Sequence, residues 1–269
     1  MPHTKRPRTL ILIGGHEDKE GDRAILKEVA RRVGNGPLVI TAVASHEPEG
    51  YFETYQRVFK ELGVREVREL EVRTREDAAQ EKKSDCLEGA AGVFFTGGDQ
   101  LRITSQIGDT LVYRRLMAVY EKGGLIAGTS AGASVVCDTM LVQGHAQESH
   151  RIGDVRMAPG LGILKDVIVD QHFAERGRIG RLLGAVTQNP RVLGVGIDED
   201  TSVCIENEER FTVLGNAAVT VVDGSGITTS NIAEDGDDAV LTVTDVKLHI
   251  LGSGARFDLK ARRPLLPED

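Results

Sequence analysis

A serine at position 130 stands among small residues, in a segment that reads GTSAG over positions 128–132. The segment fits the pattern G-x-S-x-G, in which a serine occupies a strained turn between a strand and a helix and projects its hydroxyl above the sheet. In such a turn the backbone N–H of the next residue, here Ala131, is placed to stabilise an oxyanion. Small residues also let a helix pack closely on a sheet. The pattern therefore allows two interpretations, a nucleophile and a packing motif.

A nucleophilic serine needs a base, and His172 is the best placed of the seven histidines. The apolar residues 167–169 predict a strand, and Asp170, Gln171 and His172 follow where that strand should end. Because the carboxyl ends of parallel strands share one edge of a sheet, we expect His172 near Ser130. The alternative is a histidine that is hydrogen-bonded within a loop.

The third member should be a carboxylate that orients the histidine. Residues 195–197 predict another strand, which leads into Asp198, Glu199 and Asp200. The spacing does not choose among the three acids. The chain order serine, histidine, acid differs from the order serine, acid, histidine of the α/β-hydrolases, so that fold is excluded, although the same roles arise in other orders.

A second group of polar residues lies in GHAQESH, residues 144–150. His145, Glu148 and His150 could hold a metal ion, but their spacing is not HExxH and no strand or helix pattern orients them. We expect a loop near the pocket and no metal.

Strand and helix patterns alternate over the first 200 residues. Apolar runs predict strands at 9–13, 38–44, 67–72 and 93–95, and amphipathic patterns predict helices at 22–34, at 50–62 and on to about residue 122. This alternation predicts an α/β fold with a mostly parallel sheet and helices on both faces. Glycine-containing turns after three strands, at 14–15, 97–98 and 128, should gather at one edge, and none has the spacing of a nucleotide-binding motif.

The pattern changes after about residue 200. Short antiparallel strands are predicted at 201–206, 210–214, 217–222 and 240–250, with turns such as Asp223-Gly224 between them. We therefore expect one α/β domain over residues 1–269, with a β-rich extension at about 201–260.

The composition limits the environment and the partners of the chain. A net charge of −8 over 269 residues argues against nucleic-acid binding. No apolar run approaches the ~20 residues of a membrane span, and the apolar run at 9–13 is too short for a signal peptide. Three widely spaced cysteines, Cys86, Cys137 and Cys204, form neither a disulfide framework nor a zinc pattern. We expect a cytoplasmic protein with no membrane or nucleic-acid partner.

Five segments together resemble the S51 serine peptidases, the class that contains cyanophycinases and aspartyl dipeptidases, and resemble the cyanophycinases most. They are ILIGGHEDK (11–19), FFTGGDQLRI (94–103), GTSAGAS (128–134), DQHFAERGRIGRL (170–182) and GIDEDTS (196–202). The resemblance implies a three-layer, flavodoxin-like fold, similar to class I glutamine amidotransferase domains, extended by C-terminal antiparallel strands. It also implies a homodimer without cofactor that cleaves cyanophycin, multi-L-arginyl-poly-L-aspartate, to β-aspartyl-arginine dipeptides. An aspartyl dipeptidase and a catalytically silent binding module on the same fold are the alternatives.

The resemblance also assigns roles to residues. Ser130 matches the nucleophile, His172 the base and Glu199 the acid, which singles out Glu199 among the three acids. Gly98 and Ala131 match the oxyanion hole. The residues that match substrate-binding positions are Gln100, Asp170, Gln171, Arg176, Arg178 and Arg181. His16 stands where the family typically has alanine, and a simple surface loop residue is expected there.

The substrate that the resemblance implies explains why arginine side chains would stand at substrate-binding positions. Each unit of the polymer carries a carboxylate and a guanidinium, and the arginine fork suits carboxylates. Arg178 and Arg181 fall on one helical face, and Asp170 could bind a substrate guanidinium. The alternative is that Arg176, Arg178 and Arg181 form a solvated helix start.

Overall fold

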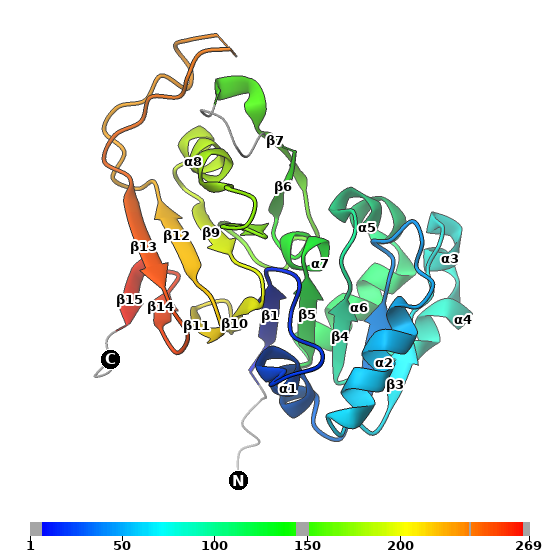
Figure 1. Ribbon diagram of the computed structural model, residues 1–269. Helices are drawn as coiled ribbons and strands as arrows, with labels where there is room; N and C mark the ends of the chain where they lie inside the picture. Colours follow the sequence, from blue (N-terminus) through cyan, green and yellow to red (C-terminus); the bar gives the residue numbers. More distant parts are fainter. Residues whose placement is uncertain (1–6, 144–150, 237, 266–269) are drawn as a thin grey trace.

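The computed structural model describes residues 7–143, 151–236 and 238–265 (Figure 1). Within these residues, a nine-stranded sheet has the order β15-β14-β11-β10-β1-β5-β4-β2-β3. Its parallel strands are β1 (Thr9–Ile13), β5 (Leu125–Thr129), β4 (Gly92–Phe95), β2 (Leu38–Thr41) and β3 (Val67–Glu69). Its antiparallel strands are β10 (Thr201–Glu206), β11 (Arg210–Gly215), β14 (Arg256–Asp258) and β15 (Arg263–Leu265). The predicted α/β class with C-terminal antiparallel strands is confirmed.

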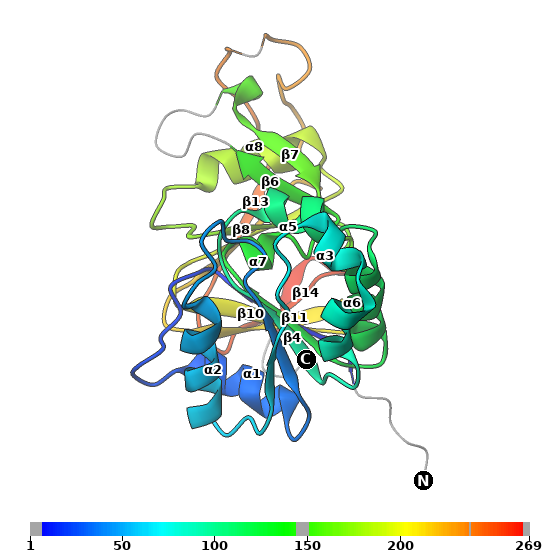
Figure 2. The same ribbon diagram turned by 90° about the vertical axis from the view of Figure 1, so that its right-hand side faces the viewer.

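Helices cover both faces of this sheet. The strand β1 carries apolar side chains on both faces, so both faces need to be covered. Ile11 and Ile13 pack with α1 (Ala24–Val33) and α2 (Tyr51–Glu61). Leu10 and Leu12 belong to the other core, with α5 (Gln100–Ile107) and α6 (Leu111–Glu121). Figure 2 shows α1 and α2 on one side of the sheet and α3 and α6 on the other. The shorter helices are α3 (Arg75–Ala79), α4 (Glu81–Ser84), η1 (Asp85–Leu87) and α7 (Ala131–Ser134).

A second sheet lies beside the first and was not expected. Its order is β13-β12-β9-β8, with β8 (Val167–Gln171) parallel to β9 (Leu193–Ile197), then β12 (Val219–Asp223) and β13 (Lys247–Leu251). The helix α8 (Ile179–Gln188) packs on it through Leu182 and Val186. The pair β6 (Thr139–Gln143) and β7 (Arg156–Pro159), with η2 (Ile152–Asp154) before β7, lies next to β8.

Some predicted boundaries were wrong. The strands predicted at 38–44 and 67–72 end at Thr41 and Glu69. The strand predicted at 240–250 is formed only over Lys247–Leu251. Val240 and Val243, in the first part of the predicted range, form isolated bridges and no continuous strand. Short helices at 75–84 were not predicted, although the capping box of Thr74 and Asp77 is a sequence signal for the first of them.

No helix in the described ranges has the length and apolar composition needed to cross a bilayer. The described cysteines Cys86, Cys137 and Cys204 are free thiols. The segment with His145, Glu148 and His150, proposed above as a loop near the pocket, lies outside the described residues.

The small residues around Ser130 pack α7 against the large sheet. A Cβ atom on Gly128 would overlap the carbonyl oxygen of Gly132, and one on Gly132 would lie 2.6 Å from the carbonyl oxygen of Phe95. Both glycines are therefore required for this close packing. The packing interpretation of the GTSAG segment is correct, and it does not exclude a chemical role for Ser130.

Gly128→Ala should destabilise the fold, because its Cβ would push α7 away from the sheet. We expect a loss of about 1–3 kcal/mol in the free energy of unfolding, measured by urea denaturation. Gly252→Ala is the matched control, since a Cβ there meets no atom within 4 Å. Equal stability of the two variants would contradict the close contact.

Candidate active site

The turn after β1 brings together three segments that are far apart in sequence. Three successive carbonyl oxygens of this turn accept hydrogen bonds from backbone N–H groups: Ile13 from Ser130 (3.0 Å), Gly14 from His172 (2.8 Å) and Gly15 from Asp200 (2.9 Å). The segments come from the carboxyl ends of β5, β8 and β9. These backbone hydrogen bonds therefore help to set the spacing of the candidate residues.

The two glycines of this turn have no room for a side chain. A Cβ on Gly14 would overlap the carbonyl oxygen of Asp198, and one on Gly15 would overlap Cε1 of the His172 ring. Gly15 also has a φ of 110°, which side chains disfavour. Glycine is thus needed at both positions for the neighbouring segments to approach.

Ser130 lies between β5 and α7 in a strained conformation, with φ 54° and ψ −114°. Such a backbone is rare for a residue other than glycine and is typical of a nucleophile elbow. Its Oγ lies 2.9 Å from Nε2 of His172. The N–H of Ala131, at the first position of α7, has no acceptor within the helix, so it can serve an oxyanion. Gly98, at φ 145°, lines the same cavity.

His172 connects the serine to an acid. Its Nδ1 lies 2.6 Å from Oε1 of Glu199, and the side chain of His172 is only 5% exposed. With the ring proton on Nδ1 donated to Glu199, Nε2 is free to accept the proton of Ser130. Burial lowers the pKa of His172; the hydrogen bond to Glu199 opposes this shift, and the charge of Arg176 adds to it. The ring is therefore neutral at pH 7, as a base must be.

The neighbouring acids are held away from the histidine. Asp198 accepts the backbone N–H groups of Ala174 (3.0 Å) and Ala218 (3.2 Å). Asp200 accepts from the backbone N–H of Asp18 (2.8 Å) and from Nδ2 of Asn216 (2.6 Å). Glu199 alone of the three reaches His172, a choice that the spacing left open.

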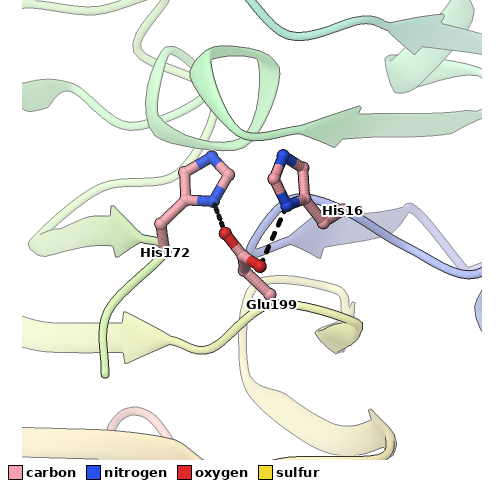
Figure 3. Close-up of side chains that lie close together, drawn as sticks. All are labelled: His16, His172 and Glu199. Carbon is pink, nitrogen blue, oxygen red and sulfur yellow. Dashed lines mark hydrogen bonds and ion pairs between the residues drawn. The ribbon is translucent and has the colours of Figure 1, made fainter. Parts of the chain in front are cut away.

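His16 is an exposed loop residue, as expected, but it also contacts the candidate site. Its Nδ1 lies 2.9 Å from Oε2 of Glu199, and its ring meets that of His172 edge to face, with centroids 5.2 Å apart (Figure 3). Burial tends to raise the pKa of Glu199, but the hydrogen bonds and charges of the two histidines outweigh it, and the pKa is lowered. The sequence signal for this contact was the position of His16 directly after the turn Gly14-Gly15.

Asp170 does not face the cavity as a free carboxylate, which corrects the expectation that it binds a substrate guanidinium. It lies within β8, is fully buried, and accepts Nε of Arg181 (2.6 Å), Nη2 of Arg181 and Nη1 of Arg178 (3.2 Å). Arg178 also donates to the backbone and side-chain oxygens of Gln171. Buried acids and guanidinium groups of this kind require such pairing.

The arginines are not a solvated helix start either, with one exception. Arg178 and Arg181 are 8% and 6% exposed, whereas Arg176 is exposed. Burial lowers the pKa of Arg178 to about 10, so the guanidinium stays charged at pH 7. One carboxylate, Asp170, faces two guanidinium groups, which leaves an excess positive charge beside the cavity.

A cavity of about 820 Å³ collects most of these residues. Its lining includes His16, Gly97, Gly98, Gln100, Ser130, Gln171, His172, Arg176, Arg178 and Arg181. Gln100 is held by a hydrogen bond of 2.6 Å from its Nε2 to the carbonyl oxygen of Leu141. Of the predicted substrate-binding residues, Asp170 is the one that does not line the cavity.

An acidic side chain that was not expected from the sequence lines the same cavity. Glu17 is 3% exposed and accepts hydrogen bonds from Tyr55 and from Oγ1 of Thr129 (2.6 Å), while Nζ of Lys19 lies 2.9 Å from it. Thr129 precedes Ser130, so Glu17 ties the glycine turn to the serine segment. The sequence signal for a role of Glu17 in the cavity was its position shortly after the turn at 14–15.

Asp170→Asn should destabilise the protein, because two buried guanidinium groups would lose the carboxylate with which they pair. Among the described residues, no other carboxylate forms an ion pair with Arg178 or Arg181. We expect a loss of about 3–5 kcal/mol in the free energy of unfolding by urea denaturation. The control is Asp22→Asn, since the pair of Asp22 with Lys27 is exposed and should contribute less than about 1 kcal/mol. A small effect at Asp170 would show that the buried ion pairs do not stabilise the fold.

Comparison with known proteins agrees with the resemblance that the motifs predicted. The sequence model of peptidase family S51 matches residues 10–213. The chain is 42% identical over 259 residues to a cyanophycinase of Nostoc sp., covering 95% of this chain and 87% of that protein. It is 36% identical over 260 residues to a cyanophycinase of Geminocystis herdmanii, covering 96% of each.

A solved structure is similar in fold. The structure of a peptidase from an acI-B1 actinobacterium superposes with a TM-score of 0.69 at 22% identity, covering 94% of this chain and 98% of that one. At 22% identity this similarity is evidence for the fold only. The family match covers most of the chain and the curated relatives cover nearly all of it, so this chain belongs to peptidase family S51 and is a peptidase.

Proposed function

We propose that this peptidase hydrolyses cyanophycin to β-aspartyl-arginine dipeptides, with Ser130 as nucleophile, His172 as base and Glu199 as the acid that orients it. The observation that carries the proposal is the continuous hydrogen-bond chain from Ser130 through His172 to Glu199 at the wall of a large cavity. The cyanophycinase names of the full-length relatives support the substrate.

Acylation begins when Oγ of Ser130 attacks a backbone peptide carbonyl next to a β-linked aspartyl unit. Nε2 of His172 takes the hydroxyl proton, and Glu199 stabilises the imidazolium that forms. Backbone N–H groups of Gly98 and Ala131 bind the oxyanion of the tetrahedral intermediate. His172 then gives its proton to the leaving amine, the C–N bond breaks, and an acyl-enzyme on Ser130 remains.

Deacylation repeats these steps with water. His172 removes a proton from a water molecule that attacks the ester carbonyl, and the proton returns to Oγ of Ser130 as the ester bond breaks. The strained backbone of Ser130 and the bond between His172 and Glu199 are formed in the free protein, so the reaction needs little reorganisation of these groups. The proposed mechanism uses no metal and no organic cofactor.

Charge in the cavity suits the polymer. The excess positive charge of Arg178 and Arg181 over Asp170, together with exposed Arg176, favours the arginine carboxylates of the substrate. Glu49 is exposed, lines the cavity and can supply negative charge for the guanidinium groups of the substrate, whereas Glu17 is enclosed and already paired with Lys19. Asp170 acts through the two arginines that it holds, without touching the substrate.

We also expect a homodimer in a reducing cytoplasm, without nucleic-acid or membrane partners. Free thiols at the three cysteines suit a reducing compartment, and the net charge of −8 disfavours nucleic acid. An aspartyl dipeptidase of the same family remains the alternative substrate assignment, and a silent binding module is disfavoured by the intact hydrogen-bond chain.

Wild-type protein should release β-aspartyl-arginine from insoluble cyanophycin, as measured by mass spectrometry of the soluble products, and should act poorly on α-linked Asp-Leu. Ser130→Ala should lower turnover by ~10⁴-fold or more while its urea denaturation curve stays close to that of the wild type. Release of dipeptides by Ser130→Ala at the wild-type rate would disprove the mechanism. Preferential cleavage of Asp-Leu would instead identify an aspartyl dipeptidase.

The pH dependence follows from His172, which accepts a proton only when neutral. Because burial lowers its pKa from the usual 6.5, the rate should persist below pH 6.5 and fall only as the pH drops through the lowered pKa. The midpoint of the acid limb of kcat/KM should therefore lie below 6.5. Arg176→Gln removes a positive charge that lowers this pKa, so it should move the midpoint upward. A wild-type midpoint above 6.5 would contradict the assignment.

A further inference from the structure

Two histidines share one carboxylate at the candidate site. Nδ1 of His172 lies 2.6 Å from Oε1 of Glu199, and Nδ1 of His16 lies 2.9 Å from Oε2 (Figure 3). The proposed reaction uses His172 and Glu199 but leaves His16 without a role. In the part of the chain that the structure describes, this is the one group of three histidine, cysteine or acidic side chains whose ligand atoms lie within 4.8 Å of one another.

We propose that His16, Glu199 and His172 form an inhibitory zinc site. Two imidazole nitrogens and one carboxylate oxygen are donors that Zn²⁺ binds well, with a fourth position left for water. Bond lengths of ~2.0–2.2 Å place two ligands of a tetrahedral zinc about 3.3 Å apart. The ligand atoms of the three side chains, one from each, lie within 4.8 Å of one another, so each pair would need to shift by at most about 1.5 Å to reach this spacing.

The exposure of the three side chains allows an ion to enter. His16 is 74% exposed and Glu199 is 25% exposed, and His16 lines the open cavity beside Ser130. His172 is buried, but its Nδ1 faces Glu199 and thus the same point. Of the three, His16 has the most exposed side chain and therefore the most room to move toward an ion.

Zinc at this point would prevent the serine from being activated. When Zn²⁺ takes the lone pair of Nδ1, the single proton of the neutral His172 ring resides on Nε2. That nitrogen then donates to Oγ of Ser130, 2.9 Å away, and cannot accept its proton. The ion also occupies the carboxylate that would stabilise the imidazolium. The inhibition rests on the proposed role of His172, whereas zinc binding itself does not.

Zinc binding can be measured without activity, by titrating untagged Ser130→Ala protein with Zn²⁺ in a calorimeter. We expect one site per chain, and no binding of Mg²⁺, which prefers oxygen ligands. The comparison protein carries His16→Gln in addition to Ser130→Ala. The glutamine amide can still donate a hydrogen bond to Glu199, but a zinc ligand is lost. This change should weaken binding by at least the ~10–100-fold that loss of a supporting hydrogen-bond partner costs. Equal affinity with and without His16 would overturn the site.

The inhibition is tested on the catalytically intact chain. Zn²⁺ should abolish wild-type hydrolysis and a chelator should restore it, whereas His16→Gln should need at least ~10-fold more zinc, each rate being normalised to its own zinc-free value. Equal zinc sensitivity of the two proteins would overturn the proposal. If the wild type fails to hydrolyse cyanophycin, the proposed function fails, and the calorimetric comparison still decides the zinc site.

Discussion

Three backbone hydrogen bonds at the end of β1 determine the geometry of the site. The carbonyl oxygens of Ile13, Gly14 and Gly15 hold the segments of Ser130, His172 and Asp200 at fixed spacing. These contacts exist because the turn has no side chains: a Cβ on Gly15 would overlap the His172 ring. The arrangement also explains the positive φ angles of Ser130 and His172, since packing and backbone bonds around them offset the strain.

The site lies where two sheets meet. Ser130 follows β5 of the large sheet, whereas His172 and Glu199 follow β8 and β9 of the smaller one. The chain passes directly from β9 through Glu199 into β10, which pairs with β1 of the large sheet. Residues 198–200 therefore bridge the two sheets. The hydrogen bonds of Asp198 and Asp200 fix this bridge and leave Glu199 to point at the histidine.

Two carboxylates beside the cavity, Asp170 and Glu17, are buried and held by hydrogen bonds. Asp170 is fully enclosed and neutralises one of the two guanidinium groups of Arg178 and Arg181, so the three side chains together carry a net positive charge. Glu17 is similarly enclosed by Tyr55 and Thr129. Both acids support groups that reach the cavity, and both keep their place through hydrogen bonds that a surface residue would share with water.

Local patterns in the sequence were sufficient for the α/β class and the strand before Ser130, because apolar periodicity and glycine turns are local properties. The approach of His172 to Ser130 was also expected, but from a shared sheet edge, whereas His172 follows a strand of the second sheet. The motif resemblance pointed to Glu199 as well. The tertiary structure alone decided that β8 and β9 form a separate sheet, that Asp170 is enclosed by Arg178 and Arg181, and that His16 reaches Glu199. Each of these depends on contacts between residues far apart in the chain, and a single sequence contains no measure of such distances.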